Sequence, residues 1–270
     1  MDIRKIDWNE AWKKAHAEGS RKWKDPGFWN RRAPSFAKHA AESPYASDFI
    51  GIMQPEQHWS VLDVGCGAGT LARPLSKMVK QITAIDSSDV MITLLQEQCA
   101  KEGLLNVTAL NIGWEEDWEK AGVGIHDVTI ASRSLIVEDL KEALNKLNRF
   151  ARKRVYISAL VGDGPFDRRI FEAIGLEIDR RPDYIYIYNL LYQMGIYADV
   201  TFVTNQGHGK VYSDLEAAVQ DLRWMIDELN SEKEVLLREY LRRNLIKKEG
   251  GWGLPHQHVV RWAIISWSIS

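Results

Sequence analysis

Between residues 58 and 161, short runs rich in β-branched residues alternate with helical segments, and this alternation restricts the fold more than any other feature of the chain. The expected strands are Ser60–Val64, Gln81–Ile85, Asn106–Leu110, Asp127–Ala131 and Arg154–Leu160. Helices are expected near 70–79, 88–102, 115–120 and 137–152. Strands and helices that alternate at this spacing form parallel βαβ units. The sequence therefore predicts an α/β protein with helices on both faces of a mostly parallel sheet.

The flanking regions differ in character from this central part. Residues 1–57 are rich in tryptophan and are cut into short helical pieces by prolines, which predicts a helical cap. Residues 206–258 carry two expected helices, near 213–229 and 231–247. We expect a single domain over 1–270, with the cap at 1–57, the core at 58–205, a helical lid insertion at 206–258 and a last strand at 259–270.

The region from 162 to 205 is expected to continue the core. Phe166–Gly175 and Asp183–Gly195 are predicted as helices and Ala198–Val203 as a sixth strand. Residues 184–188 read Tyr-Ile-Tyr-Ile-Tyr, which alternates like a strand. A helix is favoured because the apolar content continues to Met194 and stops at Gly195.

Composition excludes several classes of protein. The formal charge is −2, from 35 Lys and Arg against 37 Asp and Glu, which disfavours a nucleic-acid binder that works by charge alone. The two cysteines cannot build a disulfide framework. The first 19 residues have no apolar run typical of a signal peptide, and no stretch approaches the ~18 apolar residues of a membrane span. We expect a cytoplasmic protein without membrane association.

The segment Val61-Leu62-Asp63-Val64-Gly65-Cys66-Gly67-Ala68-Gly69-Thr70 is the most informative stretch. A buried strand runs into three glycines at alternate positions, and a helix follows. Glycine lets the backbone turn tightly and lets a ligand approach closely, while the helix offers unpaired N–H groups. A second strand ends at Asp86, 19 residues after Gly67, where an acid can accept hydrogen bonds from ribose hydroxyls. The pattern predicts a nucleotide site.

This pattern, Asp63–Gly69 followed by Asp86, resembles motif I and the following acidic position of the class I S-adenosylmethionine-dependent methyltransferases. The third glycine stands one residue earlier than in dinucleotide sites, which disfavours NAD. The resemblance covers 58–161 well and 162–205 more loosely. It implies a Rossmann-like, seven-stranded, mostly parallel sheet with an antiparallel last strand, and S-adenosylmethionine as the cofactor.

The resemblance also implies roles for individual positions. The backbone at Gly65, Cys66 and Gly67 would lie against the methionine part of the cofactor, and Asp86 would hold the ribose. The turn at Gly113-Trp114-Glu115 would meet the adenine, with Glu115 or a backbone amide replacing the acid that the family has near Gly113. The complete set expected to bind the cofactor is Asp63, Gly65, Cys66, Gly67, Gly69, Asp86, Ser87, Trp114, Glu115 and Ser132.

The loop Ser132-Arg133-Ser134 would line the methyl-transfer site. Arg133 departs from the neutral residues that are commoner there, and would bind a substrate anion or the carboxylate of the cofactor. The loop lacks the Asn/Asp-Pro-Pro-Tyr pattern of enzymes that methylate amide or exocyclic nitrogens, and it has no cysteine for attack on a pyrimidine carbon. Those two substrate classes are disfavoured.

Methyl transfer needs an oriented nucleophile and, for a weakly acidic one, a general base. The candidate bases near the expected active-site edge are His39, His208, His256 and His258, with Tyr45 and Asp163 as weaker candidates. We expect the catalytic residues to be His208, His256, His258 and Arg133. The three histidines could also gather a metal ion, but their segments offer no cysteine or carboxylate ligand, so no metal site is predicted.

The favoured function is methylation of a small molecule. RNA or protein methylation is an alternative, because Arg238, Arg242, Arg243, Lys247 and Lys248 could form a basic surface. Interspersed Glu232, Glu234 and Glu239 favour an ordinary solvated helix face instead. A binding protein without methyl transfer is a third alternative, since a binding loop does not establish turnover.

Overall fold

The computed structural model describes residues 5–18, 27–30, 33, 44–178, 182–205, 210–223, 225–226 and 229–269. The chain divides into two compact units, each of which is described by itself. Unit 1 comprises Met1–Leu160, Arg181–Val203 and Trp262–Ser270, and unit 2 comprises Val161–Arg180 and Thr204–Arg261. In the described part of the chain, no helix combines the length and the apolar character needed to cross a membrane.

Unit 1 is built on a seven-stranded sheet with the strand order β3-β2-β1-β4-β5-β9-β6. The strands are β1 (Ser60–Val64), β2 (Gln81–Asp86), β3 (Val107–Asn111), β4 (His126–Ser132), β5 (Ala151–Leu160), β6 (Asp199–Asn205) and β9 (Val260–Ser268). Strands β1 to β5 pair in parallel, while β9 runs antiparallel to β5. The predicted Rossmann-like architecture is confirmed.

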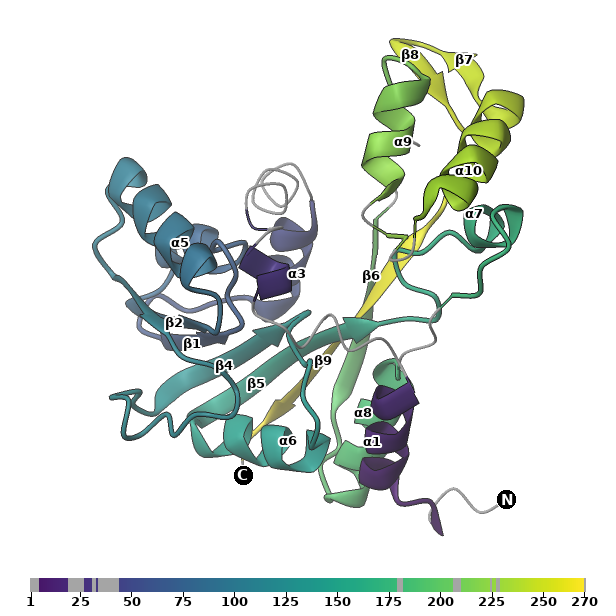
Figure 1. Cartoon of the computed structure of the whole chain (residues 1–270). Helices are drawn as coiled ribbons and strands as arrows, with labels where there is room; N and C mark the ends of the chain where they lie inside the picture. Colours follow the sequence, from purple (N-terminus) through teal and green to yellow (C-terminus); the bar gives the residue numbers. More distant parts are fainter. Residues whose placement is uncertain are drawn as a thin grey trace. The chain divides into compact units, whose positions relative to one another are not determined.

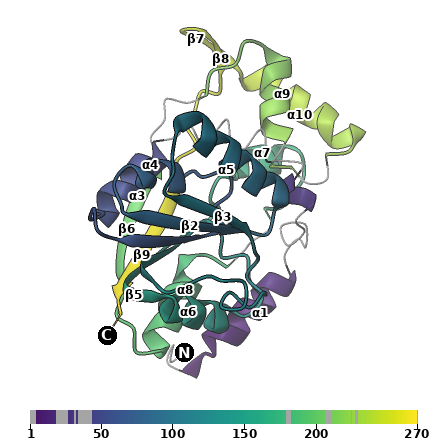
Figure 2. The ribbon, with the colours of Figure 1, turned by 90° about the vertical axis from the view of Figure 1, so that its left-hand side faces the viewer.

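Two groups of helices cover the two faces of this sheet (Figures 1 and 2). One face carries α3 (Tyr45–Met53), α4 (Ala72–Ser76) and α5 (Asp89–Glu102). The other carries α1 (Trp8–Glu18), α6 (Leu140–Arg149) and α8 (Tyr184–Gln193), with α1 packed against α8. All five residues of β1 are buried, as expected of a central strand covered on both faces.

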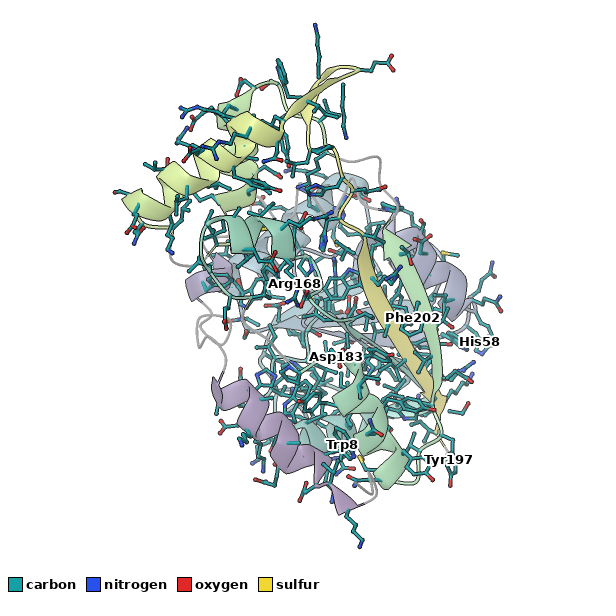
Figure 3. The ribbon with its side chains drawn as sticks, turned by 90° about the vertical axis from the view of Figure 1, so that its right-hand side faces the viewer. Trp8, His58, Arg168, Asp183, Tyr197 and Phe202 are labelled. Atoms are coloured by element: carbon teal, nitrogen blue, oxygen red, sulfur yellow. The ribbon has the colours of Figure 1, made fainter. Side chains whose placement is uncertain are left out.

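The predicted helix over the alternating tyrosines is confirmed, since α8 spans Tyr184–Gln193. The Asp183 carboxylate caps it by accepting a hydrogen bond from the Ile185 N–H at 3.0 Å. Ile187, Leu190 and Leu191 are its buried residues, as expected for helical spacing. Figure 3 labels two residues that follow this helix: Tyr197 precedes the edge strand β6, and Phe202 lies in it.

Unit 2 contains α7 (Arg168–Ala173), α9 (Leu215–Arg223), α10 (Ser231–Asn244) and a small hairpin of β7 (Ile246–Lys248) and β8 (Gly251–Gly253). Helix α10 packs against both α7 and α9. Lys233 Nζ donates to the carbonyl oxygen of Ile174 at 2.9 Å, near the end of α7. The buried Leu222, Leu237 and Leu241 form part of its apolar interior.

Two expectations about local structure are wrong. Residues 115–120 form turns and not a helix, because Trp118 is buried and donates from Nε1 to the Gly113 carbonyl at 2.8 Å. Lys146 Nζ meets the carbonyl oxygens of Trp114 and Glu116 at 2.7 and 2.6 Å, so these groups are paired without a helix. The β7–β8 hairpin lies in a region where only helices were expected.

Candidate functional site

The glycine loop follows β1 at the carboxyl edge of the parallel strands, where open α/β sheets bind their ligands. Gly65 has φ +67°, and a Cβ atom there would lie 2.3 Å from Cβ of Ser134. Ser134 itself donates from Oγ to the Val64 carbonyl oxygen at 2.6 Å. The loop after β4 is therefore fixed against the end of β1, and only glycine fits at position 65.

Asp86, at the end of β2, closes the same loop. Its Oδ2 accepts the Gly67 N–H at 2.8 Å and its Oδ1 accepts the Ser88 N–H at 2.9 Å. Burial raises the pKa of this carboxyl group, although both hydrogen bonds oppose the rise. The predicted acid is thus held directly beside the glycine loop. Ser87, which follows it, is exposed.

Asp63, two residues before the first glycine, is a buried carboxyl group. Its Oδ2 has no hydrogen-bond partner among the described residues. Burial, reinforced by the neighbouring charge of Asp86, raises the pKa of Asp63 to about 7. A buried acceptor of this kind is unusual in a native protein and is stabilised when a cationic or donor group arrives.

In the turn after β3, the acid that contacts Gly113 is Glu116. The Glu116 carboxylate accepts the Gly113 N–H through Oε1 at 2.8 Å, and both Glu115 and Glu116 are exposed. Trp114 donates from Nε1 to the Ser134 carbonyl oxygen at 2.9 Å and thereby ties this turn to the loop after β4. Glu116 was not singled out from the sequence. Its spacing of three residues from Gly113 was the available signal.

Arg133, in the loop after β4, lies in a cluster of aromatic and hydroxyl side chains. Its guanidinium carbon is 4.2 Å from the ring centroid of Tyr45 and 5.5 Å from that of Trp262. The Tyr45 hydroxyl makes hydrogen bonds of 2.6 Å with the Oγ atoms of both Ser132 and Ser158. Burial raises the pKa of Tyr45 and lowers that of Arg133. These side chains come from α3, β4, β5 and β9 of unit 1.

Cys66 is buried within the glycine loop, and its Sγ lies 3.4 Å from the Gly67 carbonyl oxygen. Burial raises the pKa of this thiol well above its usual value. A thiol in this state is a poor nucleophile, since the thiolate is the reactive form. Its side chain fills the turn as a small apolar group.

The expected histidines are found in unit 2, apart from two that lie outside the described residues, His39 and His208. His256 Nε2 is 3.1 Å from Oδ2 of Asp167, a buried carboxylate that Arg169 also contacts through Nε at 2.8 Å. His258 Nε2 donates to the Gly164 carbonyl oxygen at 2.9 Å. In the part of the chain that the structure describes, no three His, Cys, Asp or Glu side chains are grouped to hold a metal ion.

The sequence analysis gave Asp167 no role. It is the N-cap residue of α7, a position where aspartate is common. The contacts of Tyr45 with Ser158 and Trp262, which are far from it in the chain, were not predicted either.

The unit 1 site suits a nucleotide with a cationic amino-acid part. Asp86 is a carboxylate beside the glycine loop, a kind of group that accepts hydrogen bonds from ribose hydroxyls, and the Gly65 position leaves room that a side chain would fill. The buried acceptor of Asp63 fits a positive group. These features fit S-adenosylmethionine.

Comparisons with known proteins agree with this interpretation. Residues 61–154 match a family model described as a methyltransferase domain. An uncharacterised protein of Haemophilus influenzae is 32% identical over 250 residues, covering 90% of each chain. A ubiquinone biosynthesis O-methyltransferase of Xylella fastidiosa is 32% identical over 78 residues, which is 29% of this chain and 31% of that protein.

A solved structure from Bacillus halodurans, named as a candidate methyltransferase, superimposes with a TM-score of 0.53 at 12% identity. The match covers 83% of this chain and 97% of that one. Residues 61–154 form a methyltransferase domain. Its fold and its glycine loop are those of the Rossmann-like, class I S-adenosylmethionine-dependent methyltransferases.

Proposed function

We propose that this protein transfers a methyl group from S-adenosylmethionine to a small-molecule acceptor by in-line displacement. The observation that carries the proposal is the cradle in unit 1, where Asp86 accepts the Gly67 N–H and Ser134 packs against Gly65. The residues proposed to bind the cofactor are Asp63, Gly65, Cys66, Gly67, Gly69, Asp86, Ser87, Trp114, Glu115 and Ser132, to which the geometry adds Glu116.

The cofactor supplies an activated methyl group on a sulfonium, so the protein has mainly to bind and orient. Asp86 holds the ribose hydroxyls, while the glycine loop allows the methionine part to approach the backbone. Asp63, once ionised, balances the positive charge. Orientation of this kind can supply up to ~7–11 kcal/mol of barrier reduction in well-aligned systems.

For an acceptor with a weakly acidic proton, we propose His256 and His258 as the candidate general bases, with His208 as a third. The Asp167 carboxylate accepts the Nε2–H of His256, which leaves Nδ1 as the proton acceptor. His258 donates Nε2–H to the Gly164 carbonyl, so its Nδ1 is also an acceptor. Arg133 is proposed to bind an anion near the reacting atoms.

A small acceptor is favoured over RNA by the pairing of cations in unit 2. Arg238 contacts Glu216 at 2.7 Å and Glu234 at 2.8 Å, and Arg243 pairs with Glu239. Arg223 also pairs with Glu234, at 2.6 Å. Arginines neutralised in this way offer little net charge to a phosphate backbone. Known relatives include a ubiquinone biosynthesis O-methyltransferase, but also ribosomal RNA and ribosomal protein methyltransferases.

Calorimetric titration with S-adenosylmethionine tests the cofactor assignment. We expect saturable binding to the wild-type protein and a loss of ten-fold or more in affinity for Asp86→Ala. Equal affinity of the two proteins would contradict the assignment.

Incubation with methyl-labelled cofactor and separate pools of small metabolites, RNA and protein then tests the acceptor. Label recovered only in RNA or protein would contradict a small-molecule acceptor, and binding without any transfer would indicate a non-catalytic protein.

A further inference from the structure

Arg133 has an unusual backbone conformation for a residue with a long side chain. Its φ is +57°, in the left-handed region that favours glycine, and Gln54 is the other non-glycine residue with positive φ in the described part of the chain. The Arg133 N–H lies 3.2 Å from the Ser158 carbonyl oxygen and 3.0 Å from Ser158 Oγ. A conformation of this kind is costly and is retained where its surroundings fix it, often at ligand sites.

The guanidinium of Arg133 is oriented by two aromatic rings. Its carbon is 4.2 Å from the Tyr45 ring centroid and 5.5 Å from the Trp262 centroid. The two rings are inclined at 66° to each other, with their centroids 6.1 Å apart, so the cation lies against two differently oriented aromatic surfaces. A carboxylate binds an arginine through two parallel N–H···O bonds in the plane of the guanidinium. The ring contacts therefore hold the cation in place at this edge, where its N–H groups are the donors that a carboxylate would accept.

Tyr45 is in turn fixed by the hydroxyls of Ser132 and Ser158, each at 2.6 Å from its own hydroxyl. Ser132 is the last residue of β4, and Ser158 lies opposite it in the register of β4 and β5. The arginine is thus held at the carboxyl edge of the parallel strands by elements of the rigid sheet. It remains partly accessible, since the residue is neither fully buried nor fully exposed.

We propose that Arg133, positioned by Tyr45, Trp262 and Ser158, is a carboxylate-binding site at the methyl-transfer edge. Two molecules could supply the carboxylate: the methionine part of the cofactor, or a methyl acceptor that is itself a carboxylic acid. The inference rests on the proposed function, since it assumes that the cofactor binds at this edge. Arginine suits this role better than lysine because its fork matches a carboxylate bidentately.

Binding measurements distinguish the two sources. Isothermal titration compares S-adenosylmethionine with its decarboxylated analogue on the wild-type protein and on Arg133→Gln. If the cofactor supplies the carboxylate, the wild type prefers the intact cofactor by ten-fold or more, and Arg133→Gln loses that preference. If the acceptor supplies it, Arg133→Gln leaves both constants within two-fold. The wild type loaded with S-adenosylhomocysteine then binds benzoate but not neutral benzamide, and the variant binds neither.

Arg154→Gln is the matched control, because Arg154 also lies over a tyrosine ring, with 5.4 Å between its guanidinium carbon and the centroid of Tyr156. It should leave every constant within two-fold. Arg133→Lys keeps the positive charge but loses the pair of parallel N–H donors. It should lose part of the affinity for whichever ligand, the intact cofactor or benzoate, depends on Arg133. Circular dichroism and thermal melting establish that each variant is folded, and the comparison of benzoate with benzamide on the wild type needs no variant.

The proposal is overturned if Arg133→Gln changes neither the preference for the carboxylated cofactor nor the binding of benzoate. It is also overturned if the wild type discriminates in neither pair of probes. A wild-type protein that fails to bind S-adenosylmethionine at all would instead contradict the proposed function. The two failures are therefore distinguishable in the same set of titrations.

Discussion

At the scale of single residues, Gly65 is the position where conformation and space act together. Its φ of +67° disfavours any side chain, and an added Cβ would meet Cβ of Ser134 at 2.3 Å. We expect Gly65→Ala to lower the free energy of unfolding by about 1–3 kcal/mol, since it combines backbone strain with overpacking. It should also weaken cofactor binding. Urea denaturation and calorimetric titration measure the two effects.

Gly103 provides the control for this substitution. It has the same φ of +67°, but nothing lies within 4 Å of an added Cβ. Gly103→Ala should therefore cost only the conformational part, about 1 kcal/mol, and leave cofactor binding unchanged. The double variant Gly65→Ala with Ser134→Gly should recover the steric part. Equal losses at positions 65 and 103 would show that the close approach to Ser134 is unimportant.

We expect Asp63 to make cofactor binding depend on pH. Its pKa of about 7 means that the carboxyl group is largely protonated at pH 6 and largely ionised at pH 8. If the cationic cofactor binds the ionised form, its affinity should rise about ten-fold between these pH values. Asp63→Asn should remove this rise. Titration calorimetry at pH 6, 7 and 8 checks the prediction, and an unchanged pH profile in Asp63→Asn would contradict it.

The same group affects the stability of the ligand-free protein in the opposite direction. Because the folded-state pKa is raised, protonation favours the folded state. This contribution is fully present below the ordinary pKa near 3.8 and is lost as the pH rises through about 7. Thermal melting of the ligand-free protein should therefore show a component that declines between pH 5 and pH 8 and is missing in Asp63→Asn.

At the scale of elements, Asp139 joins two helices. Its Oδ1 caps α6 by accepting the Glu142 N–H at 2.9 Å and accepts Asn9 Nδ2 of α1 at 3.1 Å. Its Oδ2 is 2.9 Å from Lys13 Nζ, also of α1. We expect Asp139→Ala to destabilise unit 1 by about 1–2 kcal/mol in urea unfolding, since both the cap and the links to α1 are lost.

Asp139→Asn separates these contributions, because the amide keeps a capping oxygen but loses the charge opposite Lys13. It should cost less than half of the alanine variant, since exposed ion pairs contribute little. Asn230→Ala removes the N-cap of α10 in unit 2, where Oδ1 accepts the Lys233 N–H at 2.9 Å, and gives the cost of a cap alone. A similar loss for Asp139→Ala and Asp139→Asn would assign the effect to the ion pair.

The elements best predicted from the sequence are those whose local pattern and tertiary environment agree. Strand β1 has the expected bounds, Ser60–Val64, because a short β-branched run enters a glycine turn. The helix over 184–193 followed from where its apolar content ends. The segment 115–120 was mispredicted, since its turns depend on the burial of Trp118 and on a distant lysine, Lys146.

The candidate site was predictable only where its residues are close in the sequence. Asp63, Gly65 and Asp86 belong to one local motif, whereas Tyr45 and Ser158 are 113 residues apart and meet through the sheet. No pattern of neighbouring residues in the sequence predicts a contact of this kind. Glu116 is a related case, since its hydrogen bond with the Gly113 N–H depends on the geometry of the turn and was not predicted.

At the scale of the whole molecule, the chain leaves unit 1 after Leu160 and Val203 and re-enters it at Arg181 and Trp262. All the residues proposed to bind the cofactor belong to unit 1. The strands before and after the longer unit 2 segment, 204–261, are β6 and β9, which are neighbours in the sheet. The two ends of the segment 204–261 therefore lie on neighbouring strands of the sheet.

Consider a variant in which glycine-serine linkers replace 162–180 and 206–258. We expect it to fold as unit 1 and to bind S-adenosylmethionine within about three-fold of the full-length affinity. The reason is that Asp63, Gly65 and Asp86 keep their surroundings within unit 1. Its methyl transfer should be lost if the histidines proposed as bases in unit 2 act in the reaction. The same linkers in an Asp86→Ala background control for non-specific binding. Folded protein that no longer binds the cofactor would contradict the prediction and show that unit 2 is needed for cofactor binding.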